Sequence, residues 1–236
     1  MVGVKRARRK DARPGELLAA ALDLFVEKGF AATRAEEVAH RAGVSKGTLF
    51  LYFSSKDELF KAVVRDSIGA QFSAWEAELD TTTDSATQLL QRCMTEWWER
   101  IGSTKAAGIT KLMMSEANNF PTLAQFYRTE VIEPGNRLIR RILQRGMDSG
   151  EFRILDLHYG VYLVLAPMMF LAMWQHSFGV TAPSDQKIDP LAYIEAQLIN
   201  IMSGLKAPSQ VPASAATLGP VQGRTPTLRR TASIDG

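Results

Sequence analysis

The sequence predicts an all-α protein with a small N-terminal three-helix unit and a larger helical C-terminal domain. Nearly every segment of the 236 residues has apolar residues at helical spacing, and none shows the sustained alternation typical of strands. Serine, threonine or aspartate precedes several of these segments, as expected of helix N-caps. With 46% hydrophobic residues the chain can bury a sizeable core. A single cysteine, Cys93, excludes an intramolecular disulfide and a zinc site built from several cysteines.

The first third of the chain predicts four helices. Gly29 is the natural stop of the first. Thr33 and Glu36 form a capping box that opens the second, and Ser45 caps the third after a glycine-containing turn. Ser55, followed by Glu58, opens a long fourth helix. The predicted ranges are 15–28, 33–42, 45–53 and 55–79.

The rest of the chain predicts five longer helices before a polar tail. Pro134 is expected to kink or split the third of them, and Asp189 with Pro190 is a strong helix start. The last 30 residues contain no aromatic residue and cannot bury enough surface to order themselves. The helices are predicted over 86–102, 106–118, 121–147, 156–178 and 190–205. The expected domains are a basic flexible arm (1–14), a three-helix unit (15–60), a larger helical domain (61–206) and a disordered tail (207–236).

The net charge of +3 conceals an uneven distribution. Residues 1–56 carry 11 Lys and Arg against 6 Asp and Glu, whereas residues 57–206 carry 14 against 18. The surplus is greatest near the N-terminus, in a basic block suited to polyanions such as nucleic acid. Taken alone, this block is equally consistent with a solvated tail that aids solubility. Its basic residues are Lys5, Arg6, Arg8, Arg9, Lys10 and Arg13.

Residues 33–53 have the pattern of a helix-turn-helix, in which two short helices meet at a tight turn. Ala39 is small enough for the helices to cross closely, and Gly43 accepts a positive φ at the turn. Ser45 caps the second helix and leaves a polar first turn that can approach phosphates or base edges. A plain helical corner is the alternative. The surrounding basic charge and this polar turn together favour DNA binding.

Residues 15–64 closely resemble the N-terminal DNA-binding domain of TetR-family (TetR/AcrR-like) transcriptional regulators. The resemblance also covers the plan of the chain, since the family has a long linking helix followed by a larger all-helical domain. It rests on Gly29-Phe30, Thr33, Val38-Ala39, the run from Ala42 to Leu49, Tyr52-Phe53 and the run from Lys56 to Leu59.

The resemblance implies which residues contact DNA. Thr48 and Gly47 would approach bases, while Thr33, Tyr52 and Lys56 would hold phosphates. The sequence departs from the family at Phe50, where tyrosine is usual, and at Arg34, where a small hydroxyl residue is usual. Phe50 could pack on a thymine methyl, and Arg34 could add a phosphate contact. The expected DNA-binding residues are Thr33, Arg34, Ser45, Lys46, Gly47, Thr48, Phe50, Tyr52 and Lys56.

Tryptophan and methionine are concentrated beyond residue 70, which holds all four tryptophans and eight of the nine methionines. Such residues most often fill a core, but they also make adaptable walls around apolar ligands. Adjacent Trp97 and Trp98 point about 100° apart, so only one should line a given cavity. Glu116 is the candidate for orienting a cationic ligand, and a salt bridge with Arg128 or Lys111 is its alternative. The expected ligand-binding residues are Trp75, Met94, Trp97, Trp98, Met113, Glu116, Phe120, Phe126, Met169 and Met173.

The last two predicted helices carry apolar residues expected to join two subunits. On the final helix these residues are spaced by 3, 4, 3 and 4, as in a helix seam. The stretch Val161–Trp174 is apolar on all faces and must be covered all round. Two helices from each subunit would make a four-helix bundle, and packing of the seam within its own chain is the alternative. The expected interface residues are Val164, Met168, Leu171, Leu191, Ile194, Leu198, Ile201 and Leu205.

These features predict a homodimeric, ligand-responsive repressor that binds a palindromic operator in double-stranded DNA. The alternative is a DNA-binding regulator without a small-molecule ligand, controlled by a protein partner or by concentration. An enzyme is not expected, because the histidines (His40, His158, His176) lack metal-pair spacing and no phosphate loop or serine elbow is present. No metal or cofactor is expected. The 14-residue stretch Val161–Trp174 is shorter than the about 20 residues of a membrane span, so a cytoplasmic protein is predicted.

Overall fold

The computed structural model describes the backbone of residues 3–206 and the side chains of residues 14–206. Within this part of the chain the structure is helical, with one isolated antiparallel bridge between Phe152 and Lys206. The helices are α1 (Gly3–Ala32), α2 (Ala35–Arg41), α3 (Lys46–Tyr52), α4 (Lys56–Val64), α5 (Ala70–Thr81), α6 (Ala86–Trp97), α7 (Ala106–Glu116), α8 (Pro121–Tyr127), α9 (Glu133–Asp148), α10 (Leu157–Gln175) and α11 (Pro190–Leu205).

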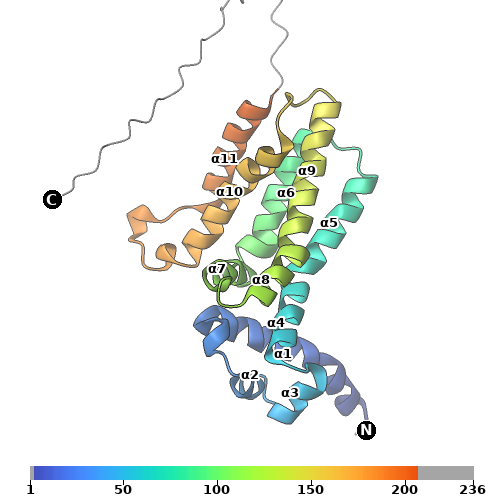
Figure 1. Ribbon diagram of the computed structural model, residues 1–236, viewed down its shortest axis with the longest axis vertical. Helices are drawn as coiled ribbons and strands as arrows, with labels where there is room; N and C mark the ends of the chain where they lie inside the picture. The colour runs from blue at the N-terminus through green and yellow to red at the C-terminus, as the bar shows by residue number, and fades with distance from the viewer. Residues whose placement is uncertain (1–2, 207–236) are drawn as a thin grey trace, which may run out of the picture.

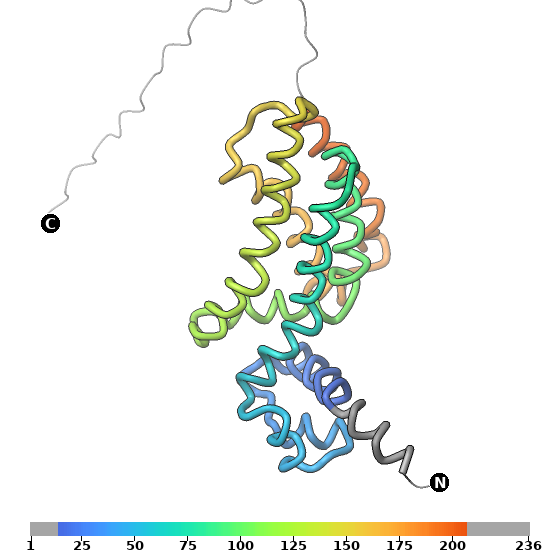
Figure 2. The backbone as a smooth tube through the Cα atoms, turned by 90° about the vertical axis from the view of Figure 1, so that its right-hand side faces the viewer, coloured from blue at the N-terminus to red at the C-terminus, as the bar shows by residue number. Residues whose placement is uncertain are grey.

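The molecule has a small head, α1 to α4, below a larger body, α5 to α11 (Figure 1). A π-helical turn, Arg65–Gly69, joins α4 to α5, so that one continuous helix runs from the head into the body (Figure 2). Similar turns extend α6 through Trp98–Gly102 and link α8 to α9 through Arg128–Ile132, immediately before Pro134. The long helices predicted over 55–79, 86–102 and 121–147 are therefore confirmed, with Pro134 marking the interruption in the last.

Helix α1 differs from its predicted range at both ends. It begins at Gly3, so most of the segment expected to be a flexible arm is helical, with Pro14 inside the helix. Arginine, lysine and alanine there are strong helix formers, and a single proline does not outweigh them. Gly29 is the predicted break, at φ 83°, although the chain continues in helical form to Ala32. The predicted tail, 207–236, lies outside the described residues.

The predicted capping box at Thr33 is wrong by one residue. Helix α2 begins at Ala35, and the carboxylate of Glu37 accepts a hydrogen bond from the Arg34 amide at 3.3 Å. Thr33 is 1% exposed, and its hydroxyl donates toward the carbonyl oxygens of Leu24 and Gly29. Thr33 therefore closes the end of α1 instead of opening α2.

An aromatic cluster joins the head to the body. Phe25, Phe30 and Phe60 are buried in the head, with ring centroids 5.3 to 5.6 Å apart. Phe120, in the turn before α8, packs edge-to-face on Phe30 at 4.9 Å. Aromatic pairs of this geometry stabilise beyond their buried area, by about 1 kcal/mol. The head core and the lower end of the body are thus one continuous apolar cluster.

Helix α10 is the most apolar element of the described chain. It has 19 residues, so by length and composition alone it could cross a membrane, contrary to the estimate from the uncharged stretch. In this structure it packs against α7, α9 and α11, which bury residues such as Val161 and Leu171. The apolar residues on these sides of α10 therefore form part of the buried core of the body.

Candidate nucleic-acid interface and ligand cavity

Helices α2 and α3 form the predicted helix-turn-helix. Val38, Ala39 and Leu49 are buried in the angle between the helices, and Gly43 turns the chain at φ 66°. The Ser45 hydroxyl accepts a hydrogen bond from the Thr48 amide at 3.1 Å, which confirms it as the N-cap of α3. The local physics of the motif therefore agrees with the sequence, from the cap to the turn.

The outer surface of α3 holds most of the residues expected to contact DNA. Ser45, Lys46, Gly47 and Phe50 are exposed, while Thr48 and Tyr52 are half-buried beside them. Thr48 Oγ1 lies 2.9 Å from Ser45 Oγ, so its rotamer is set by the cap. Arg34 is exposed at the start of α2, next to this surface in the chain.

Leu51 also lies on α3, although the sequence interpretation did not single it out. It is 83% exposed, the highest value among the large apolar side chains described. The exposure of Leu51 could have been inferred from the sequence. Leu49 fills the core position of this short helix, so the residue two places later points outward. An exposed leucine beside exposed Phe50 gives the helix an apolar edge.

Two residues expected to hold phosphates make contacts within the protein. Thr33 is buried, as described above, and cannot reach a DNA backbone. The Lys56 ammonium donates to the carbonyl oxygens of Phe30, Ala31 and Thr33 at 2.8, 3.3 and 3.1 Å. It also lies 4.3 Å from the centroid of the Phe30 ring. Lys56 therefore satisfies the carboxyl end of α1, where a cation is favoured by unpaired carbonyls and the helix dipole.

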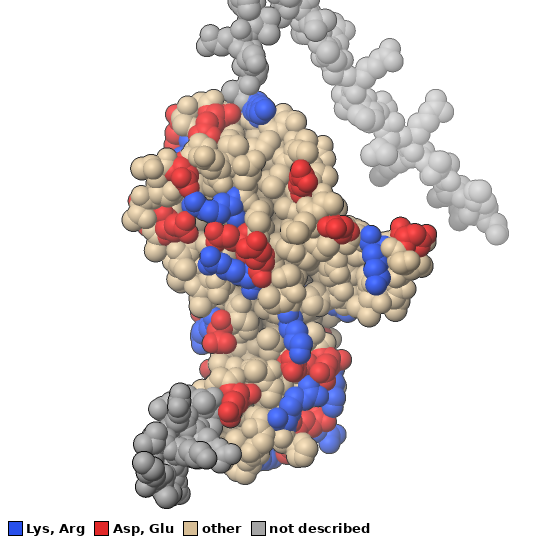
Figure 3. All heavy atoms as spheres, turned by 180° about the vertical axis from the view of Figure 1, so that it is seen from behind, with Lys and Arg blue, Asp and Glu red and all other residues tan. Residues whose placement is uncertain are grey.

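The charges of the described part of the head are balanced. Residues 14–56 carry five basic and five acidic residues, so the surplus of the N-terminal region resides in the first 13 residues. Arg41 binds Glu27 through two hydrogen bonds, and Lys46 pairs with Glu36. Acidic and basic side chains accordingly lie side by side on the head in the view of Figure 3. The described head is therefore neutral overall, and the net positive charge of the N-terminal region comes from residues 1–13 of the sequence.

The body encloses a cavity of about 480 Å³ between α10 and the helices α5 to α9. This volume is within the usual range for sites that bind small molecules. Its walls are mainly apolar, with Thr110, Tyr127, Arg128, Asn136 and Tyr162 as polar exceptions. Met114, Arg128, Ile132, Tyr162 and Ala166 are the exposed members of the lining, so the cavity opens between α10 and the turn after α8.

Half of the predicted ligand-binding residues line this cavity: Trp75, Met94, Trp97, Met113 and Met169. Trp98 is buried and does not line the cavity, as expected if only one of the adjacent tryptophans can face a cavity. Phe126 lies against Arg65, with 4.9 Å between its ring centroid and the guanidinium. Phe120 packs on the head, and Met173 lies one turn beyond the lining. Cys93, Thr110, Tyr127 and Asn136 line the cavity and were missed.

Glu116 points to the head and not to the cavity. Its Oε1 atom accepts a hydrogen bond from the Phe30 amide at 3.2 Å. Oε2 is buried and has no hydrogen-bond partner among the described residues. Neither salt bridge considered for Glu116 forms, because Lys111 donates to the carbonyl of His176 and Arg128 pairs with Glu133. The predicted role of Glu116 in orienting a ligand does not fit this position.

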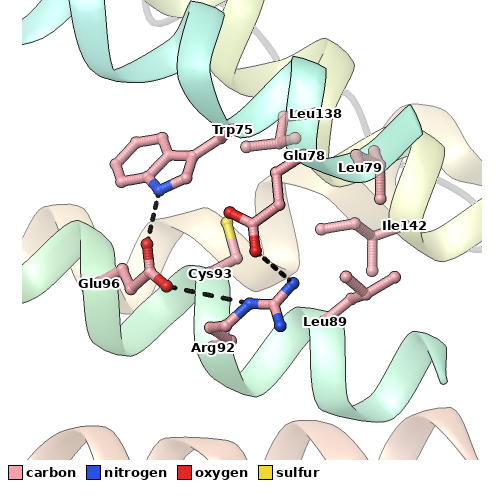
Figure 4. A pocket seen from close by; sticks show the side chains of 9 residues that line it. All are labelled: Trp75, Glu78, Leu79, Leu89, Arg92, Cys93, Glu96, Leu138 and Ile142. Carbon is pink, nitrogen blue, oxygen red and sulfur yellow. Dashed lines mark hydrogen bonds and ion pairs between the residues drawn. The ribbon is translucent and has the colours of Figure 1, made fainter. Parts of the chain in front are cut away.

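Trp75 and Cys93 form part of a wall between the cavity and a hollow of about 20 Å³ on the outer side, between α5 and α6 (Figure 4). Trp75 donates its indole N–H to Glu96 at 2.8 Å, away from the cavity. Arg92 crosses the hollow to bind Glu78 at 2.9 Å. Burial raises the pKa of the Cys93 thiol to about 12, which favours the protonated thiol at neutral pH.

Most of the predicted interface residues are buried within their own chain. Helix α11 packs on α10 and α6, and these contacts bury Ile194 and Leu205 within the chain. Val164 and Met168 line the cavity. Only Leu191, at 62%, is largely exposed, while Leu198 and Ile201 are half-buried. The buried residues are Val164, Met168, Leu171, Ile194 and Leu205.

Leu191 and four apolar residues outside the predicted set are exposed on α10 and α11. We refer to these residues as the α10–α11 face, made of Tyr159, Leu163, Phe170, Leu191 and Ile199. The first three share one side of α10, since they are spaced by four and seven residues. Large apolar side chains gathered on one surface typically mark a protein–protein contact.

A capped helix-turn-helix on a head, seated on a helical body with an apolar cavity, defines a DNA-binding transcriptional regulator. The family model described as bacterial regulatory proteins, tetR family, matches residues 17–63. A second model, described as the tetracyclin repressor-like C-terminal domain, matches residues 80–185. The chain belongs to the TetR family.

Its relatives include both a transcriptional activator and a transcriptional repressor. The HTH-type transcriptional repressor KstR2 of Mycolicibacterium smegmatis is 31% identical over 145 residues, 60% of this chain and 68% of the relative. The HTH-type transcriptional activator FasR of the same organism is 43% identical over 89 residues, 37% of this chain and 41% of that relative. The structure of FadR from Bacillus subtilis in complex with stearoyl-CoA shares the fold, with a TM-score of 0.67, 22% identity and coverage of 80% and 97% of the two chains.

Proposed function

We propose that the protein is a homodimeric repressor in the cytoplasm that leaves a palindromic operator when a small, largely apolar ligand fills the cavity. The observation that carries this proposal is the position of α7. This helix lines the cavity through Thr110 and Met113 and contacts the head through Glu116. A ligand that fits better when the head is displaced would weaken operator binding by its difference in affinity for the two states.

The lining favours an apolar ligand over a cation. Arg128 is the one charged side chain in the lining formed by the described residues, and no carboxylate is present there. A cation would therefore lose its hydration without gaining a counter-charge. The expectation of a cationic ligand is thus replaced by that of a neutral or anionic-headed one. The stearoyl-CoA complex of the similar FadR supports a long apolar ligand in this chain as well.

The alternative of a regulator that binds no small molecule receives less support. It would fit a solid core around Trp97 and Met113, whereas both residues line the cavity. Apolar compounds that quench the fluorescence of Trp75 and Trp97 would count against this alternative.

The proposal is tested by incubating the purified protein with sheared genomic DNA of its source organism at near-physiological salt. Sequencing of the retained fragments should reveal a shared palindrome with half-sites about one helical turn apart. The same fragments should be released when an apolar ligand is added. Retention without any shared sequence would contradict a sequence-specific dimer.

Dimerisation is expected to depend on the α10–α11 face. Leu163→Glu should weaken self-association by roughly 100-fold, because burial of an unpaired carboxylate costs several kcal/mol. Leu163 is 71% exposed, so the substitution leaves the fold of the monomer intact. Light scattering after size-exclusion chromatography measures the mass. Ile154→Glu changes an equally exposed residue outside both helices and should remain dimeric; monomers from both variants would argue against this face.

Leu51 is expected to contact a thymine methyl group when α3 enters the major groove. Replacing the contacted thymine by deoxyuridine should weaken binding by about fourfold, the value of roughly one buried methyl group. The variant Leu51→Ser should bind both operators alike, as measured by fluorescence anisotropy at fixed salt. Equal sensitivity to deoxyuridine in the parent and in Leu51→Ser would place the methyl contact elsewhere.

A further inference from the structure

Two buried hydroxyl groups meet at the wall of the cavity. Thr110, in the middle of α7, and Tyr127, the last residue of α8, have their oxygen atoms 2.8 Å apart. Thr110 is 9% exposed and Tyr127 is 5% exposed. Both residues line the 480 Å³ cavity. A polar pair is therefore held in an interior wall that is otherwise mainly apolar.

The pair has more hydrogen-bonding capacity than it uses. Each hydroxyl can donate one hydrogen bond, and one of the two donates to the other. Among the described residues, neither oxygen has a further partner, so one O–H is left to donate. A buried donor without an acceptor costs about 1–3 kcal/mol, and native structures nearly always pair such groups.

The other polar groups of the lining are placed differently. Arg128 and Tyr162 are exposed, Asn136 is half-buried, and the Trp75 N–H is bonded to Glu96 away from the cavity. A ligand that enters from the exposed side passes these groups before it reaches the hydroxyl pair. The pair is thus the buried polar feature against which the apolar part of a ligand would lie.

The pair suits a neutral acceptor better than an anion. Burial raises the pKa of the Tyr127 phenol to about 12, with the hydrogen bond to Thr110 opposing the shift, so the phenol keeps its proton at neutral pH. Neither residue brings a positive charge, and a carboxylate at this depth would have only one neutral donor. A carbonyl oxygen needs one donor and carries no net charge.

We propose that Thr110 and Tyr127 form a polar subsite that recognises a neutral carbonyl oxygen within an otherwise apolar ligand. Ketones, esters and thioesters are the chemical classes with such an oxygen. The subsite would discriminate against a ligand with a methylene group at that position, because the O–H would then remain unpaired. This inference rests on the proposed role of the cavity as the ligand site.

The test compares 2-acetylnaphthalene with 2-ethylnaphthalene, which has a methylene group in place of the carbonyl group next to the ring. Each probe displaces the fluorescent dye N-phenyl-1-naphthylamine from the full-length protein and from the variants Thr110→Val and Tyr127→Phe. Both substitutions remove a hydroxyl with little change in side-chain shape. Tyr193→Phe is the matched control, because it makes the same change at a half-buried tyrosine of α11 that does not line the cavity.

We expect Tyr127→Phe and Thr110→Val to lower the affinity for 2-acetylnaphthalene about five- to tenfold. Affinity for 2-ethylnaphthalene should stay the same or rise, and Tyr193→Phe should change the affinity for neither probe. Equal losses for both probes would show a packing effect and overturn the subsite. Unchanged affinities would show that the hydroxyls bond only each other or water, and would also overturn the subsite. Failure of the dye to bind the parent protein would overturn the proposed ligand site together with this inference.

Discussion

Replacing Gly29 by alanine is expected to lower the free energy of unfolding by about 3 kcal/mol. Gly29 has φ 83° and ψ 168°, a conformation that is essentially restricted to glycine. A Cβ atom there would also lie 2.6 Å from Oε1 of Glu116, which is itself held by the Phe30 amide. Backbone strain and this contact act together at the seam between head and body. Urea unfolding followed by far-UV circular dichroism measures the loss.

Two comparisons separate the causes of this effect. Gly15→Ala has open space around its Cβ within α1 and should stabilise the protein by about 0.5–1 kcal/mol. Combining Gly29→Ala with Glu116→Ala removes the close contact but leaves the strain, so the double mutant should recover about 1 kcal/mol relative to additivity. If Gly29→Ala, like Gly15→Ala, did not lower the free energy of unfolding, the glycine conformation at residue 29 would not be required for stability.

The seam at Gly29 bears directly on the proposed function. Glu116 ends the same helix, α7, that presents Thr110 and Met113 to the cavity. Its carboxylate contacts the chain at the end of α1, one residue beyond the Gly29 bend. A ligand that moves α7 would therefore move the Glu116 carboxylate, which accepts a hydrogen bond from the Phe30 amide of the head. These contacts link the cavity wall to the end of α1 in the head.

The second large effect is expected at Lys56. The variant Lys56→Met should lower the free energy of unfolding by about 2 kcal/mol, because three carbonyl oxygens at the end of α1 lose their shared donor. Partial burial lowers the pKa of Lys56, opposed by the charges of Asp57 and Glu116. This desolvation offsets part of the gain from three charge-assisted hydrogen bonds, which is why the expected loss is not larger.

The measurement also distinguishes this role from a phosphate contact. If Lys56 is structural, Lys56→Met should be less stable in urea. The affinity of the folded protein for DNA should then keep the salt dependence of the parent. If Lys56 neutralises a phosphate, stability should be unchanged and the slope of affinity against salt should fall by about one ion. Lys46→Met is the control, because Lys46 is exposed on α3 and should show the second pattern.

The helix-turn-helix was predictable from the sequence because its determinants are local. The Ser45 cap bonds an amide three residues away, and the Gly43 turn needs only its own backbone freedom. Ser55 likewise bonds the amide of Glu58. Helix ranges follow from periodicity and breakers for the same reason. These interactions are complete within a few residues, so a pattern of residue types is enough to predict them.

The sequence by itself therefore determined the all-α class, the order of the helices and the position of α3. Only the tertiary structure decided the partners of side chains that reach across the chain. Glu116 bonds an amide 86 residues away, and Lys56 bonds carbonyls 23 to 26 residues away. Which side of α10 faces the cavity could not be predicted either, because a helix that is apolar all round carries no stripe to orient it. Such choices depend on which surfaces meet when the helices pack, and that is set by the whole fold at once.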